Sequence, residues 1–349
     1  MYLLAAAFLI RPDAAAIIAV VGIAWLLTDS RYRKPGTYLH AAALVTLPLI
    51  YVLLMYYYYG DWRPNTAHLK SFDLSTALGM SVAYFKDYTQ SGFVPLIAAI
   101  ILLIPKKSRF SILVLTAALA HLLYVALIGG DFFEDGRFLM LLLPTVSATL
   151  LHEIERRAHR GTHFAQAALG TFAIMLVLWQ APTLIKASLP ALAVQDETIL
   201  EQVRVAHVIN EVLEPADGSI GLHYLGLGYH TPAFHVVDFL GKAEPHIART
   251  QVKFGPPGHN RWDYDYALSN YDIAIIPIGE SVVRMVSEPG FEIVQRDWMF
   301  WGIAAKTALD SGRYTYVTAA EFGNQDLGAL VRNDLLGKFE ARALNGGRQ

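Results

Sequence analysis

Long apolar runs recur through the first half of the chain and stop near residue 185. They lie at about 14–28, 38–59, 93–105, 110–128, 138–151 and 164–182. Several are long enough, or nearly so, for a helix that crosses the ~30 Å hydrocarbon core of a bilayer. The chain is 54% hydrophobic and 17% charged, which is more apolar than an ordinary globular domain. We therefore predict a multi-pass α-helical membrane domain over 1–185, with about six full spans.

Residues 1–10 are also apolar, but they are too few to cross a bilayer alone. They lack the basic segment and the small-residue cleavage site that a signal peptide carries. We interpret them as a partial first span, the end of a helix whose beginning is missing.

The remaining residues, 186–349, have the mixed charge of a water-soluble domain. Apolar residues recur at helical spacing over 197–213, which predicts a helix there. Further helices are predicted near 263–269 and 280–287, and strands at 219–223, 234–240, 272–278, 291–296 and 300–306. This order of elements predicts a soluble α/β domain.

Lys and Arg are concentrated in alternate gaps between the apolar runs. Three gaps hold most of them: Arg31, Arg33 and Lys34; Lys106, Lys107 and Arg109; and Arg156, Arg157 and Arg160. Because cytoplasmic loops carry the excess of basic residues, these gaps are predicted to be cytoplasmic. The other gaps and the soluble domain are then predicted to lie together on the extracytoplasmic face.

Three outward segments carry polar residues that a plain turn does not need. They are Arg11-Pro12-Asp13, the loop 60–92, and GGDFFEDGRF at 129–138. Each has a simple interpretation as a solvated turn, and a basic residue near a bilayer can serve only to anchor the chain to lipid phosphates. Because all three segments are predicted on one face, we favour a single shared site.

The residue types in these segments are those that bind a phosphorylated sugar. Arg11, Lys70 and Arg137 are cations that can pair with a phosphate. Asp131 follows two glycines, and its carboxylate can orient a sugar hydroxyl, pair with Arg137, or hold a divalent cation with Glu134 or Asp135. Asn65 is either a hydrogen-bond partner of a sugar or a turn residue after Pro64.

Other classes of function are excluded or lack support. A formal net charge of −2 gives no basic face for nucleic acid. The chain has no cysteine, so disulfides and thiolate zinc sites are excluded. No phosphate-binding glycine loop, HExxH motif or nucleophile elbow is present. A transporter would place charges inside the spans, whereas here nearly all the charge lies between them.

The order of these motifs resembles the GT-C class of integral-membrane glycosyltransferases, and within it the bacterial group that includes the mycobacterial arabinofuranosyltransferase B. The resemblance rests on motifs in this order: Arg11-Pro12-Asp13; Tyr58-Tyr59-Gly60 with Pro64-Asn65-Thr66 and Lys70; Gly129-Gly130-Asp131 with Arg137; Asp238-Phe239-Leu240-Gly241 with Pro245-His246-Ile247-Ala248; and Gly258-His259. These motifs span nearly the whole chain.

The resemblance implies transfer of a sugar, arabinofuranose or a related one, from a polyprenyl-phosphate donor to an extracytoplasmic glycan or lipid, at a bacterial inner membrane. Arg11, Lys70 and Arg137 would bind the donor phosphate, and Asn65 and Asp131 would bind or orient sugar hydroxyls. The alternative is a non-catalytic glycan-binding or scaffold protein that kept the fold.

The catalytic carboxylate of this class lies in the first outward loop, after the first helix. Because this chain resembles the class only from a later helix onward, the resemblance implies that the base lies upstream of Met1. Within the chain, Asp13 and Asp131 are the substitutes that we nominate.

The soluble domain carries a second group of polar residues. Asp238, His246 and His259 could shape the acceptor site, although a satisfied network of turn and core residues is an equal alternative. The aromatic residues Trp298, Phe300 and Trp301 could stack on sugar rings, but aromatics at strand spacing more often fill a core, which we favour.

Overall fold

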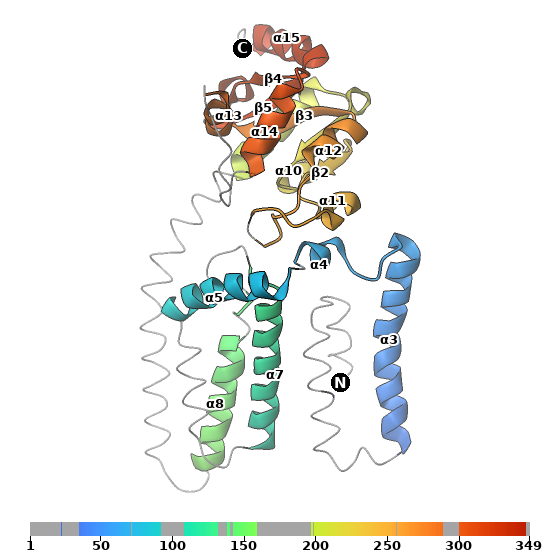
Figure 1. Cartoon of the computed structure of the whole chain (residues 1–349), viewed down its shortest axis with the longest axis vertical. Helices are drawn as coiled ribbons and strands as arrows, with labels where there is room; N and C mark the ends of the chain where they lie inside the picture. The colour runs from blue at the N-terminus through green and yellow to red at the C-terminus, as the bar shows by residue number, and fades with distance from the viewer. Residues whose placement is uncertain are drawn as a thin grey trace. The chain divides into compact units, whose positions relative to one another are not determined.

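The computed structural model describes residues 22, 35–70, 72–91, 108–131, 138–139, 142–158, 197, 199–255, 257–288 and 300–346. The chain divides into two compact units (Figure 1). The first, the helical unit, comprises Met1–Pro64 and Lys70–Thr183, and the second, the sheet unit, comprises Asn65–Leu69 and Leu184–Gln349.

The described part of the helical unit contains four helices. They are α3 (Pro35–Tyr59), α5 (Leu74–Ser91), α7 (Arg109–Leu127) and α8 (Leu142–Ala158). By the criteria of length and hydropathy, one described helix, α7, is able to cross a bilayer, and its 19 residues extend about 28 Å. The predicted spans 93–105 and 164–182, and 14–28 apart from Gly22, lie outside the described residues. The multi-pass architecture therefore stays a prediction.

Large apolar side chains are exposed on the helices of this unit. On α3 they include Leu53 and Leu54, with 57% and 60% of their surface exposed, and on α7 they include Leu119 and Leu123, with 66% and 58% exposed. Contiguous exposed apolar surface marks contact with a partner or with a membrane. These side chains are therefore suited to face lipid.

A small core joins three helices of the helical unit. The helix α7 packs against α5 and α8 (Figure 1). Tyr84 from α5 and Val125 from α7 meet Phe138 and Leu142 in this core. Helix α5 lies within the segment 60–92, which the sequence predicted only as a loop.

The first turn of α7 is tied to α8 by a buried carboxylate. Glu153 accepts hydrogen bonds from the Ser108 N–H at 2.7 Å and the Ser111 hydroxyl at 2.5 Å, and it pairs with Arg156 at 2.8 Å. Burial raises the pKa of the Glu153 carboxyl, but these three donors outweigh burial and lower that pKa to about 2. Glu153 therefore remains ionised and fixes the ends of two helices to each other.

The sheet unit is built on a five-stranded mixed sheet in the order β2-β1-β3-β5-β4. Its strands are β1 (Ser219–Leu222), β2 (Val236–Asp238), β3 (Ile273–Gly279), β4 (Tyr314–Val317) and β5 (Leu327–Arg332). The strands β2, β1 and β3 run parallel, and β5 is antiparallel to both β3 and β4.

Both faces of this sheet are covered by buried side chains. Successive strand residues point to opposite faces, and neighbouring residues of β3 belong to two different cores. Ile275 belongs to the core that includes Val205 and Ile209 of the helical segment 199–212. Besides the segment 199–212, the described α-helices of this unit are α4 (Asn65–Leu69), α10 (Gly226–Tyr229), α11 (Pro245–Arg249), α12 (Tyr264–Asn270), α13 (Glu280–Ser287), α14 (Phe300–Asp310) and α15 (Leu336–Gly346). Ile276 belongs to a second core, which contains side chains from the helices α12, α13 and α14. The predicted α/β class of this part is confirmed.

The strand predicted at 300–306 is wrong, because these residues begin α14. Phe300, Ala304, Ala305 and Ala308 are buried there, and their spacing places them on one helical face. Small alanines let the helix lie close to the sheet. The strand predicted at 291–296 falls outside the described residues, and β4 and β5 were missed.

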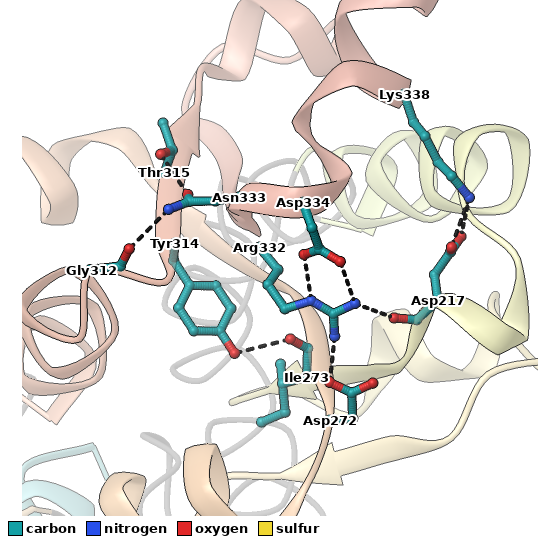
Figure 2. Close-up of polar contacts among 10 residues, drawn as sticks. All are labelled: Asp217, Asp272, Ile273, Gly312, Tyr314, Thr315, Arg332, Asn333, Asp334 and Lys338. Carbon is teal, nitrogen blue, oxygen red and sulfur yellow. Dashed lines mark hydrogen bonds and ion pairs between the residues drawn. The ribbon is translucent and has the colours of Figure 1, made fainter.

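Arg332, the last residue of β5, contacts three other segments at the carboxyl end of this strand (Figure 2). Its guanidinium donates to Asp272, to both carboxylate oxygens of Asp334, and to the carbonyl of Asp217. Lys338 in turn pairs with the Asp217 carboxylate at 2.6 Å. These contacts hold the end of β5 to the segments that carry Asp217, Asp272 and Asp334, which is a structural role.

Replacing Arg332 by methionine should lower the free energy of unfolding of the sheet unit by about 1–3 kcal/mol, because several hydrogen bonds to a charged group are lost together. Near-ultraviolet circular dichroism during denaturant titration of the full chain measures this change. Arg342→Met removes the exposed pair with Glu211 and should change the value by under about 1 kcal/mol. Equal effects of the two substitutions would contradict the role assigned to Arg332.

Candidate functional site

Two of the predicted donor-binding residues, Lys70 and Asp131, lie together in the helical unit. The Lys70 ammonium is 3.9 Å from a carboxylate oxygen of Asp131 and lies over the ring of Phe138, 4.1 Å from its centroid. The Asp131 side chain is only 3% exposed, and that of Lys70 is 20% exposed. The pair is thus largely withdrawn from water, which strengthens its electrostatic interaction.

The two glycines before Asp131 explain how the chain turns into this position. Gly129 and Gly130 have φ values of 79° and 81°, which favour glycine over residues with a Cβ atom. The Gly130 N–H donates to the carbonyl of Val125 at 3.0 Å and ends α7. A Cβ atom on Gly130 would lie 2.7 Å from Cγ of Tyr84. The glycines therefore allow a sharp turn in direct contact with α5.

The residues on the far side of this loop are also held in place. The Phe138 N–H donates to the Tyr84 hydroxyl at 3.2 Å, and the Phe138 carbonyl lies 2.6 Å from Nε2 of His121. These contacts fix the ring over which Lys70 lies. The side chains of α5 and α7 thereby hold the Lys70–Asp131 pair.

Gly130→Ala should destabilise the helical unit by about 2–4 kcal/mol, because it adds a clash with Tyr84 to a strained backbone conformation. The midpoint of thermal unfolding in detergent measures the change. Gly79→Ala on α5 is the matched control, since nothing lies within 4 Å of its added Cβ atom. An unchanged midpoint for Gly130→Ala would show that this turn is not constrained as described.

The other residues predicted at the donor site lie outside the described residues or belong to the sheet unit. Arg11, Asp13 and Arg137 lie outside the described residues, as do Glu134 and Asp135, which the sequence offered as partners of a cation. Asn65 begins α4 in the sheet unit, where its amide nitrogen lies 3.5 Å from the carbonyl of Lys242.

Asp238, predicted on the acceptor side, lies at the carboxyl end of β2 and is 1% exposed. Its two carboxylate oxygens accept the N–H groups of Leu240 at 3.0 Å and Ala243 at 2.6 Å. Burial raises the pKa of Asp238, although these N–H groups and Lys242 oppose the rise. Asp238 therefore shapes the loop that carries Lys242.

His259 is joined to this loop and His246 has other partners. The Lys242 ammonium lies 3.0 Å from Nε2 of His259. Burial and the charge of Lys242 lower the pKa of His259 to about 4, so the imidazole is neutral at pH 7 and its Nε2 accepts from Lys242. His246 on α11 stacks on Tyr266, with ring centroids 3.7 Å apart, and its Nε2 lies 3.6 Å from a carboxylate oxygen of Asp263.

One further residue of this region was missed from the sequence. His223 follows β1 and is buried, with Nε2 at 3.3 Å from the Tyr264 hydroxyl. Burial, together with the nearby His259 and Lys242, lowers the pKa of His223 to about 3. The available signal was its position at the end of the predicted strand 219–223, since ligands bind at the carboxyl ends of strands that run parallel.

Comparison with known proteins finds a similarity over part of the chain. The chain is similar to an arabinofuranosyltransferase. This relative is the terminal beta-(1->2)-arabinofuranosyltransferase of Corynebacterium glutamicum; the alignment is 164 residues long with 34% identity, and it covers 41% of this chain and 23% of the relative. The matching part is thus about a quarter of the relative. No family model and no solved structure matches the chain.

Among the described residues, no group of three or more His, Asp or Glu side chains is placed to hold a metal ion. The described part of the predicted donor site offers one ammonium, that of Lys70, beside one buried carboxylate, that of Asp131. Such a pair can neutralise an anionic group and accept a hydrogen bond from a hydroxyl.

Proposed function

We propose that the chain is a glycosyltransferase that moves arabinofuranose or a related sugar from a polyprenyl-phosphate donor to an extracytoplasmic glycan or lipid. The observation that carries this proposal is the Lys70–Asp131 pair, in which the ammonium lies 3.9 Å from a carboxylate oxygen. The two residues come from two motifs that the sequence predicts on the outward face. The similarity to a terminal arabinofuranosyltransferase supports the reaction class. A multi-pass domain in the inner membrane, with the sheet unit outside the cytoplasm, is part of the proposal.

The pair is suited to the two ends of the scissile bond in such a donor. In the transfer step an oxygen of the acceptor forms a bond to C1 of the sugar, and the bond from C1 to the phosphate oxygen breaks. The hydroxyl proton passes to a carboxylate base, and the polyprenyl phosphate leaves as an anion. Lys70 stabilises the leaving phosphate, with Arg11 and Arg137 as further cations, and Asp131 and Asn65 orient sugar hydroxyls.

A transfer assay tests this function. The full chain in lipid nanodiscs would be given a radiolabelled polyprenyl-phosphate arabinofuranose and an arabinofuranose oligosaccharide. The expected result is labelled acceptor in an amount that grows with time and with the concentration of chain. Donor that binds without any transfer would overturn the enzymatic function and favour the non-catalytic alternative.

A further inference from the structure

The sheet unit contains a cavity of about 270 Å³ whose lining includes His223 but neither Lys242 nor His259. Its walls come from the carboxyl ends of β1 and β3: His223 and Tyr224 follow β1, and Ile278 and Gly279 end β3. Leu327 completes this edge, because the antiparallel β5 begins opposite Gly279.

This location is where the topology of the sheet opens a crevice. The chain passes from β1 to β2 on one side and later returns to β3 on the other. In parallel sheets, ligands bind outside the carboxyl ends of the strands at the point where the order reverses. The cavity between β1 and β3 occupies that point, and its volume is close to the lower end of the roughly 300–1,000 Å³ of ligand sites.

The charges around the cavity exclude a phosphorylated ligand. The charged side chains among its described lining residues are the carboxylates of Glu201 and Asp326, with no Lys or Arg. Asp326 also occupies the start of α13: its oxygens accept the Ser281 N–H at 3.2 Å and the Ser281 hydroxyl at 3.4 Å. A helix start that would otherwise attract a phosphate is already neutralised by a carboxylate.

The rest of the lining suits a neutral ring that carries hydroxyl groups. Trp301 and Tyr224 meet edge to face, with ring centroids 5.2 Å apart, and both line the cavity. Aromatic faces pack against the C–H surface of a sugar, while carboxylate and amide oxygens accept hydrogen bonds from its hydroxyls. Glu201 and Gln202, on the helical segment 199–212, supply such oxygens at the cavity wall.

We propose that this cavity binds one uncharged sugar ring of a glycan, with Trp301 as the stacking surface and Glu201 as a hydroxyl acceptor. The assignment of that glycan as the acceptor of transfer rests on the proposed function, whereas its binding does not. This proposal places the glycan at the carboxyl ends of β1 and β3, whereas the sequence predicted Asp238, His246 and His259 on the acceptor side.

Isothermal titration calorimetry of the full chain in detergent tests the proposal by measuring the affinity for two probes, methyl arabinofuranoside and an arabinofuranose trisaccharide. Trp301→Leu should weaken binding about tenfold or more, and Glu201→Gln severalfold. Glu211→Gln is the matched control on the same helical segment, since its carboxylate pairs with Arg342 at 2.9 Å and does not line the cavity. Far-ultraviolet circular dichroism verifies that each variant is folded, and Glu201→Gln keeps the test valid if Trp301→Leu unfolds.

Two results would overturn this site: no sugar binding by the unaltered chain, or binding that neither Trp301→Leu nor Glu201→Gln changes. Competition by adenosine diphosphate would overturn the exclusion of phosphorylated ligands. Lys70→Met separates the two proposals, because it should remove transfer and leave sugar binding in this cavity unchanged. Sugar binding without any transfer by the unaltered chain would refute the proposed function alone.

Discussion

Lys70→Met should lower the rate of sugar transfer by about 10²–10³-fold, the typical loss when one charged or hydrogen-bonding group at a developing anion is removed. Methionine is one atom shorter than lysine; it keeps an unbranched apolar side chain near Phe138 but removes the ammonium. The partly buried carboxylate of Asp131 then lacks this cation, which further disfavours an anionic donor beside it. Initial rates with labelled polyprenyl-phosphate donor measure the effect.

Two comparisons make this result specific. Lys86→Met removes a cation from the exposed surface of α5 in the same unit and should leave the rate within about twofold, as expected for a surface position. Lys70→Arg keeps the charge with a different shape and should retain part of the activity. If Lys70→Met transferred sugar at the rate of the unaltered chain, Lys70 would have no role at the donor phosphate.

The sequence placed Lys70 and Asp131 on one face through the alternation of basic gaps, although 61 positions separate them. The sequence did not predict the distance between the Lys70 and Asp131 side chains. That distance depends on how α5 packs against α7 and on the contact of Gly130 with Tyr84, which are tertiary contacts without a local signal. Their role at a donor remains a prediction: it rested on the charge of Lys70, on the two glycines before the Asp131 carboxylate, and on the family resemblance.

The α/β part was predictable where local signals agreed. The predicted helix 280–287 matches α13, and the predicted strand 272–278 matches β3 within one residue at each end. Both have apolar residues at the period of their own element. The start of α14 misled because Phe300, Trp301 and Ile303 favour strands locally, while the buried alanines on one helical face decide the outcome.

The residues around the cavity show a second limit of sequence reasoning. His223, Glu201 and Asp326 are far apart in the chain and match no motif, yet they line one space. Their proximity follows from the strand order, because β1 lies between β2 and β3 and β5 begins at the same edge. A strand order of this kind cannot be read from periodicity, so the sequence pointed to other polar residues for the acceptor.

Glu153→Gln should destabilise the helical unit by about 3 kcal/mol at pH 7, because it breaks a buried ion pair and weakens two further hydrogen bonds. The predicted topology gives this residue no part at the extracytoplasmic site. The loss should therefore appear in the thermal midpoint of the chain in detergent, while affinity for the donor at low temperature is unchanged. Glu155→Gln, an exposed position on the same helix, should shift the midpoint far less.

The pH dependence gives this prediction its sharpest form. The pKa of Glu153 falls from its ordinary value of 4.5 to about 2 in the folded chain. The carboxylate therefore stabilises the fold fully above about pH 4.5, and this stabilisation is lost as the pH falls toward 2. The difference in thermal midpoint between the unaltered chain and Glu153→Gln should accordingly be constant from pH 7 to 5 and shrink below pH 4.5. A difference that stayed constant down to pH 3 would mean that the Glu153 charge does not hold α7 to α8.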